Sequence, residues 1–191
     1  YKLLKKESLK HSMDLIKSDL KKLGIKHDNF FSEAELVENK LVDKAVKYLK
    51  QNNYVEEGYL EPPKGEADKT WKKTKRLIFK STLFGDDTDR AIQKNDGSWT
   101  YFANDVGYHM DKINRNYEYL VNVLGADHTG YIKRITAAVS ALSENRVKLN
   151  CKVCQLVKLY KDGKPFKMSK RAGDFILAED LLNEVNKDSI R

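Results

Sequence analysis

The feature that most constrains the fold is an alternation of strand and helix patterns from about residue 98 onward. Residues 119–124 are apolar except for Asn122 and are followed by a glycine, and residues 132–142 carry an apolar stripe at helical spacing. Residues 147–160 then alternate between apolar and polar side chains. This order predicts a βαβ unit, because parallel strands need a crossover connection that is usually a helix. We therefore expect an α/β fold of the kind that forms one half of a nucleotide-binding domain.

The preceding part of the chain has mainly helical patterns. Residues 2–23 place apolar side chains on one face and lysines on the other, and Gly24 favours a stop. A second helix is expected to begin at Ser32, where Ser32 and Glu35 match a capping box, and to end near residues 52–53. Two short strands are expected, at residues 27–31 and 54–60. The lysine face of the first helix fits either a solvated surface or an RNA contact.

A hairpin is predicted for residues 90–94 and 98–102, because the Asp–Gly step at residues 96–97 favours positive φ. A helix should follow from about residue 104, with Asp105 in its first turn, where the helix dipole stabilises a carboxylate. A carboxylate is also the natural planar acceptor for a guanidinium group. The residues alone leave two alternatives open: Asp105 caps the helix and Tyr101 belongs to the core, or the pair binds a ligand.

Two further segments have the composition of a phosphate or nucleotide site. Lys167 and Lys170 flank Ser169 in a turn-prone segment between a strand pattern and a helix pattern. Two ammonium groups and a hydroxyl can bind a polyphosphate that gains charge in a transition state, although a solvated basic turn has the same composition. Asp127 and His128 follow a strand end, which is where open α/β sheets bind ligands.

The cysteines and the acidic loop do not predict a metal site. Cys151 and Cys154 lack the second ligand pair of a tetrahedral zinc site, and strand alternation points their thiols apart. We expect both to be buried, reduced core cysteines. Asp86, Asp87 and Asp89 lack the remaining ligands of a calcium loop and are expected to be surface loop acids.

Charge and hydropathy narrow the choice of partners. The formal net charge of +8 fits a polyanion such as a nucleic acid or nucleotide, but solubility alone accounts for it equally well. No apolar run approaches the roughly 18 residues that a membrane span needs, so we expect a cytoplasmic protein with no membrane partner.

Three ordered motifs resemble one enzyme family. Residues 155–173, which contain Lys167-Met168-Ser169-Lys170, resemble the KMSKS loop region of class I aminoacyl-tRNA synthetases, and of arginyl-tRNA synthetases in particular. The Gly-Ala-Asp-His of residues 125–128 and the segment 96–105 match that family in order and approximate spacing. Relatives often have a second histidine after this motif, whereas Thr129 occupies that position here.

The resemblance implies ATP-dependent activation of L-arginine to arginyl-adenylate and its transfer to tRNA(Arg), with Mg²⁺ accompanying ATP and no protein-bound zinc. It assigns three sets of residues: Lys167, Ser169 and Lys170 to catalysis, Gly125, Asp127, His128 and Met168 to ATP, and Tyr101 and Asp105 to arginine. It also implies that residues 77–191 form the second half of a Rossmann-like catalytic domain, preceded by a helix-rich inserted segment at residues 1–76. The family's His-x-Gly-His-like element has no match here, so we expect the chain alone to have little or no activity.

Two other hypotheses fit part of the pattern. Another class I synthetase or a nucleotidylyl transferase would share the KMSK loop but not the arginine pocket. A non-enzymatic basic module would bind RNA in a salt-dependent way, without any response to ATP or arginine.

Overall fold

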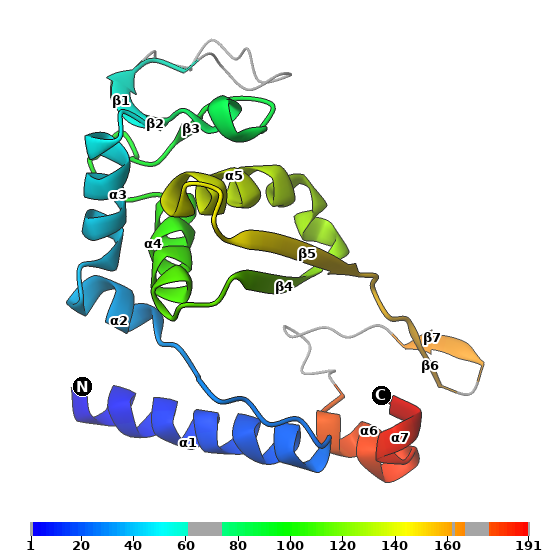
Figure 1. Cartoon of the computed structure of the whole chain (residues 1–191). Coiled ribbons are helices and arrows are strands. Elements are labelled where there is room, and N and C mark those ends of the chain that lie inside the picture. Colours follow the sequence, from blue (N-terminus) through cyan, green and yellow to red (C-terminus); the bar gives the residue numbers. More distant parts are fainter. Residues whose placement is uncertain (1, 61–73, 162, 167–175, 191) are drawn as a thin grey trace. The chain divides into compact units, whose positions relative to one another are not determined.

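The computed structural model describes residues 2–60, 74–161, 163–166 and 176–190 (Figure 1). The chain divides into two compact units. We call Phe31–Leu156 the central unit, and Tyr1–Phe30 together with Val157–Arg191 the terminal unit. The boundary expected between residues 76 and 77 separates two parts of a longer catalytic domain, and it stays a prediction.

The central unit contains the predicted βαβ unit. Strands β4 (Tyr119–Gly125) and β5 (Lys148–Cys154) pair in parallel along their whole length. Helix α5 (Ile132–Ser143) connects them and contacts β5, with the 3₁₀ helix η2 (Ala126–Tyr131) in the turn after β4 (Figure 1). This arrangement confirms a mixed α/β fold. The strand expected to continue to residue 160 ends at Cys154, because residues 155–158 have no strand pairing.

The rest of the central unit packs helices and a small antiparallel sheet around one core. The sheet order is β1 (Val55–Gly58), β2 (Arg76–Phe79) and β3 (Arg90–Ala91). The 3₁₀ helix η1 (Ser81–Phe84) follows β2 in the chain. Helices α2 (Glu33–Glu38), α3 (Leu41–Gln51) and α4 (Tyr101–Asn114) complete the unit. Its largest fully buried side chains include Phe79, Leu49, Ile92, Val106 and Ile135. The core therefore joins α3, α4, α5 and the small sheet.

Two local predictions in this part of the chain were wrong, and a third was confirmed only in part. The single helix expected from Ser32 is broken at Lys40, whose φ of 51° is left-handed, although Ser32 does cap α2 through Ala34 N–H. Residues 27–31 form no strand. The hairpin forms over fewer residues than predicted: Gln93 and Trp99 form one bridge, with backbone hydrogen bonds from Lys94 to Ser98 and from Thr100 to Ile92, and Gly97 has the expected positive φ of 82°. It is shorter because Thr100 accepts a hydrogen bond from Ala103 N–H at 3.2 Å and starts α4 earlier than expected.

The terminal unit is mostly helical. Helix α1 (Lys2–Lys22) ends two residues before Gly24, whose φ of 72° confirms the predicted stop. Strands β6 (Leu159–Lys161) and β7 (Lys164–Phe166) form a hairpin, and α6 (Ala178–Glu184) and α7 (Lys187–Ile190) follow. Lys22 bonds Glu179 at 2.6 Å, which ties α1 to α6. None of the helices in the described segments is long and apolar enough to cross a membrane.

Candidate functional site

Asp105 is the acidic residue around which the candidate site is built. Because α4 begins at Tyr101, Asp105 lies in the second turn rather than in the first turn that the sequence suggested. Its carboxylate Oδ2 accepts a short hydrogen bond from the hydroxyl of Tyr131, at the end of η2. The contact joins the helix before β4 to the turn after it. Asp105 is therefore held by tertiary structure and does not act as a helix cap.

A cavity of about 320 Å³ opens beside this contact. It lies between α4, β4 and the start of α5, and its lining includes Asp105, Tyr108, His109, Lys112, Asn122 and Tyr131. Acceptors, donors and aromatic rings thus face one space. A pocket of this kind, with few polar groups at fixed positions, suits a small ligand.

A chain of hydrogen bonds fixes α4 against β4 along this cavity. Lys112 Nζ donates to Asn122 Oδ1 at 3.0 Å, and Asn122 Nδ2 lies 2.9 Å from His109 Nε2. His109 Nδ1 lies 2.8 Å from the carbonyl oxygen of Asp105. This geometry requires the neutral imidazole with its proton on Nδ1. Burial and the nearby charge of Lys112 lower the pKa of His109 to about 4, so His109 is a packed, uncharged histidine.

Tyr131 is the site residue that the sequence patterns missed. Burial, and then its bond to Asp105, raise the pKa of the Tyr131 phenol, so it donates as a neutral hydroxyl. Its only signal in the sequence was its position in the strand-to-helix turn, immediately after Gly130 and before the apolar stripe of α5. That position predicts proximity to a strand end, but it does not identify Asp105 as the partner.

The structure does not bring the ring of Tyr101 to the Asp105 cavity. Tyr101 is the first residue of α4 and is 82% exposed. Lys94 Nζ lies 5.8 Å from the centre of its ring. Its place in the proposed pair with Asp105 therefore stays a prediction.

The Gly-Ala-Asp-His segment lies where predicted, at the carboxyl end of β4. Asp127 and His128 are exposed, with Asp127 Oδ2 3.5 Å from His128 Nε2. A Cβ at Gly125 would lie 2.5 Å from Asp127 Oδ1, so a larger residue there would displace the exposed Asp127 carboxylate. Both polar side chains are accessible to a ligand at the strand end. Lys167, Met168, Ser169 and Lys170 lie outside the described residues.

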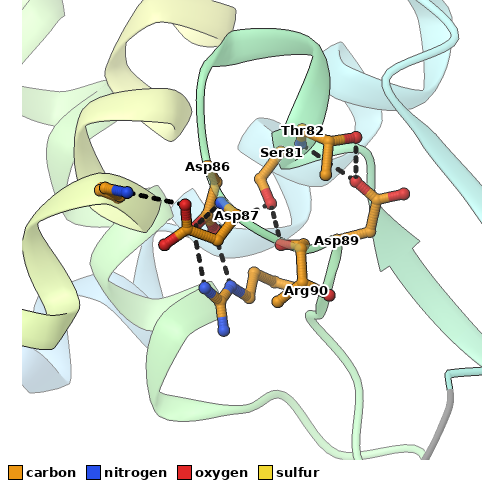
Figure 2. A network of polar contacts seen from close by, with 8 residues as sticks. Ser81, Thr82, Asp86, Asp87, Asp89 and Arg90 are labelled. Atoms are coloured by element: carbon orange, nitrogen blue, oxygen red, sulfur yellow. Dashed lines mark hydrogen bonds and ion pairs between the residues drawn. The ribbon is translucent and has the colours of Figure 1, made fainter.

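A second acidic cluster corrects the expectation for the acidic loop (Figure 2). The side chain of Asp86 is buried, and Arg90 donates to both of its oxygens at 2.7 Å. Ser81 Oγ bonds the same carboxylate at 3.0 Å. Burial opposes ionisation of Asp86, but Arg90, the N–H of Asp87 and Ser81 outweigh it and lower its pKa. Asp86 is a structural anchor rather than a surface acid.

The structure also corrects the expectation for the cysteines. Both thiols are free, and Cys151 is half-buried against the core, but Cys154 is exposed because it is the last residue of β5. Within the described segments, no group of three or more His, Cys, Asp or Glu side chains is arranged to hold a metal ion.

Comparisons with known proteins identify close relatives. The family model described as "tRNA synthetases class I (R), catalytic domain" matches residues 4–191. The "Arginine--tRNA ligase" of Pelagibacter ubique is 59% identical over 184 residues, which are 96% of this chain and 32% of that protein. The "Arginine--tRNA ligase" of Ehrlichia chaffeensis is 50% identical over 190 residues, 100% of this chain and 33% of that protein. The chain thus spans about a third of the length of these relatives.

Solved structures are similar as well. The crystal structure of a putative arginyl tRNA synthetase from Campylobacter jejuni matches with a TM-score of 0.71 and 34% identity, covering 93% of this chain and 35% of that one. Arginyl-tRNA synthetase from Plasmodium falciparum matches with a TM-score of 0.56 and 16% identity, covering 78% of this chain and 23% of that one, and shows the fold alone.

Proposed function

The chain belongs to the catalytic-domain family of the class I arginyl-tRNA synthetases, and from this premise we propose that it is part of an enzyme that charges tRNA(Arg) with L-arginine. The observation that carries the proposal is the carboxylate of Asp105, which Tyr131 orients at the edge of a cavity. A fixed carboxylate can accept two parallel N–H bonds from a guanidinium, a geometry that an ammonium group cannot reproduce.

The proposed reaction has two steps. An oxygen of the arginine carboxylate attacks the α-phosphorus of ATP, the bond to pyrophosphate breaks, and arginyl-adenylate forms. A terminal ribose hydroxyl of tRNA(Arg) then attacks the arginyl carbonyl carbon, and AMP leaves with the bonding electrons. The protein forms no covalent bond in this scheme, so positioning and charge stabilisation account for catalysis.

ATP would bind at the carboxyl end of β4. Gly125, Asp127 and His128 lie there with exposed side chains at the last two positions, as ligand-binding residues of an open α/β sheet do. Met168 would contact the nucleotide, and Lys167, Ser169 and Lys170 would stabilise the departing pyrophosphate. Mg²⁺ would enter with ATP and keep most of its ligands on phosphate and water.

Residues 77–191 would form the second half of a Rossmann-like domain, and residues 1–76 a helix-rich inserted segment. The exposed face of the parallel pair supports a larger sheet in a longer protein. Tyr119, Val121 and Val123 of β4 are all more than half exposed, although parallel sheets are normally covered on both faces. A longer protein, of the length seen in the relatives, would supply the missing cover.

The test is pyrophosphate exchange by the full-length protein, with each amino acid in turn, in the presence and absence of tRNA. We expect exchange with arginine alone. Exchange with a different amino acid would retain the KMSK assignment and refute the arginine pocket. Salt-dependent RNA binding without exchange would favour the non-enzymatic module.

A further inference from the structure

Arg134, in the first turn of α5, lacks an acceptor for its guanidinium among the described residues. Its Nε is buried and makes no hydrogen bond. The other arginines in the described segments each donate at least one hydrogen bond: Arg76 to Thr74, Arg90 to Asp86, Arg115 to Asp111 and Arg146 to Ser143. A buried donor without an acceptor is costly and needs an explanation. Arg134 is thus the described arginine whose partner is still to be identified.

Arg134 lies next to the candidate site, against the ring of Tyr131. Its Cζ lies 5.2 Å from the centre of the Tyr131 ring. The hydroxyl of the same tyrosine donates to Asp105. One aromatic side chain therefore contacts a cation at its ring and a carboxylate at its hydroxyl. Asp105 and Arg134 form no ion pair with each other within the described residues. Asp105 lines the cavity, and Arg134 lies beside the cavity, against the ring of Tyr131.

We propose that Arg134 binds the α-carboxylate of the amino acid whose guanidinium is bound by Asp105. This inference rests on the proposed function. An extended arginine molecule carries its guanidinium carbon and carboxylate carbon roughly 7 Å apart by standard bond lengths, so a molecule that lies along Tyr131 can contact both Asp105 and Arg134. Each charged end of the substrate would then meet a side chain of opposite charge.

The contact also has a chemical consequence. A guanidinium that holds one carboxylate oxygen leaves the second oxygen free and fixes its direction. That second oxygen is the nucleophile of the activation step. Arg134 would therefore orient the attacking atom in addition to increasing affinity, and an orientation of this kind lowers the entropic part of the barrier.

The experiment uses the full-length enzyme with Arg134→Gln and Arg134→Lys. Pyrophosphate exchange in the presence of tRNA gives KM for arginine and for ATP, and competition gives the inhibition constant of agmatine, which is arginine without its carboxylate. For Arg134→Gln we expect KM for arginine to rise about tenfold or more, because a charge-assisted hydrogen bond is lost. KM for ATP and the agmatine constant should stay within about twofold, and the lysine variant should fall between Arg134→Gln and the unsubstituted enzyme.

Arg146→Gln is the matched control, since Arg146 lies beyond the far end of α5 and bonds a backbone carbonyl of Ser143. A loss of agmatine binding equal to that of arginine would mean that Arg134 merely maintains the pocket, and a rise confined to KM for ATP would assign it to phosphate. Either result, or no change at all, overturns the inference while the proposed function stands. If the unsubstituted enzyme shows no arginine-dependent exchange, the proposed function fails first and the inference falls with it.

Discussion

Two aspartates of the central unit, Asp86 and Asp105, differ in how many acceptor positions of their carboxylates are already occupied by hydrogen bonds. Arg90 bonds both oxygens of Asp86 (Figure 2). The Asp86 side chain is 0% exposed. Asp105 accepts one side-chain hydrogen bond in the described part of the chain, from Tyr131, and faces a cavity. A carboxylate has about four acceptor positions, so Asp105 retains capacity that Asp86 has already used internally. The comparison separates an acid that stabilises the fold from one that is available to a ligand.

The largest expected effect is on stability, at Asp86. Asp86→Asn leaves Arg90 beside an amide that cannot neutralise it, and removing one partner of a buried ion pair costs about 3–5 kcal/mol. Hydrogen–deuterium exchange of the full-length enzyme should show faster exchange in η1 and α5. Asp87→Asn is the control, because the Asp87 carboxylate is exposed and bonds the exposed Lys133, so its effect should be small. Equal effects of the two variants would contradict the structural role of Asp86.

The next largest effect is on activity, at Asp105. Asp105→Asn should lower kcat/KM for arginine about a thousandfold, since one charge of a desolvated pair with the guanidinium is lost. Exchange protection of the central unit should change little. Asp111→Asn lies on the same helix, where its carboxylate bonds Arg115, and provides the control. A similar loss of kcat/KM in both variants would mean that α4 as a whole, and not Asp105, determines activity.

The sequence predicted the elements that depend on local pattern, and it failed where packing decides. The βαβ unit followed from apolar spacing, and Gly24 ended α1 as expected. The break at Lys40 has no Gly or Pro to signal it. Asp86 was assigned to the surface because turn acids usually lie there, whereas its burial depends on Arg90 folding back onto it.

The site shows the same division. The family resemblance singled out Asp105, but the identity of Tyr131 as its partner depends on how η2 lies against α4. Periodicity cannot supply a contact between residues so far apart in the chain. Arg134 belongs to the same class, because only the structure shows that its Nε is buried without an acceptor.

A third prediction concerns the pH dependence of stability at His109 and Asp86. An unfolded chain takes up a proton on histidine near pH 6.5, but folded His109 resists protonation until about pH 4. Stability should therefore decrease as pH falls through this window, by about 3 kcal/mol in total. Asp86, with its lowered pKa, should lose its contribution only at more acidic pH. Exchange of the α4 and β4 amides between pH 7 and 4 measures the first effect, and His109→Gln should flatten it.

The smallest effect tests whether Tyr131 orients Asp105. Tyr131→Phe removes the hydroxyl and keeps the ring on which Arg134 stacks, so the loss reports the hydrogen bond alone. We expect KM for arginine to rise about tenfold with kcat nearly unchanged, because one bond to a charged group is worth roughly 1.5 kcal/mol. Tyr117→Phe, at an exposed position in the connection before β4, should leave both constants unchanged. Without Tyr131 the carboxylate of Asp105 can still reach a guanidinium, but it must be ordered on binding, which reduces affinity rather than abolishing it. A loss as large as that of Asp105→Asn would instead make the hydroxyl itself a substrate contact and end the distinction between the residue that binds and the residue that positions.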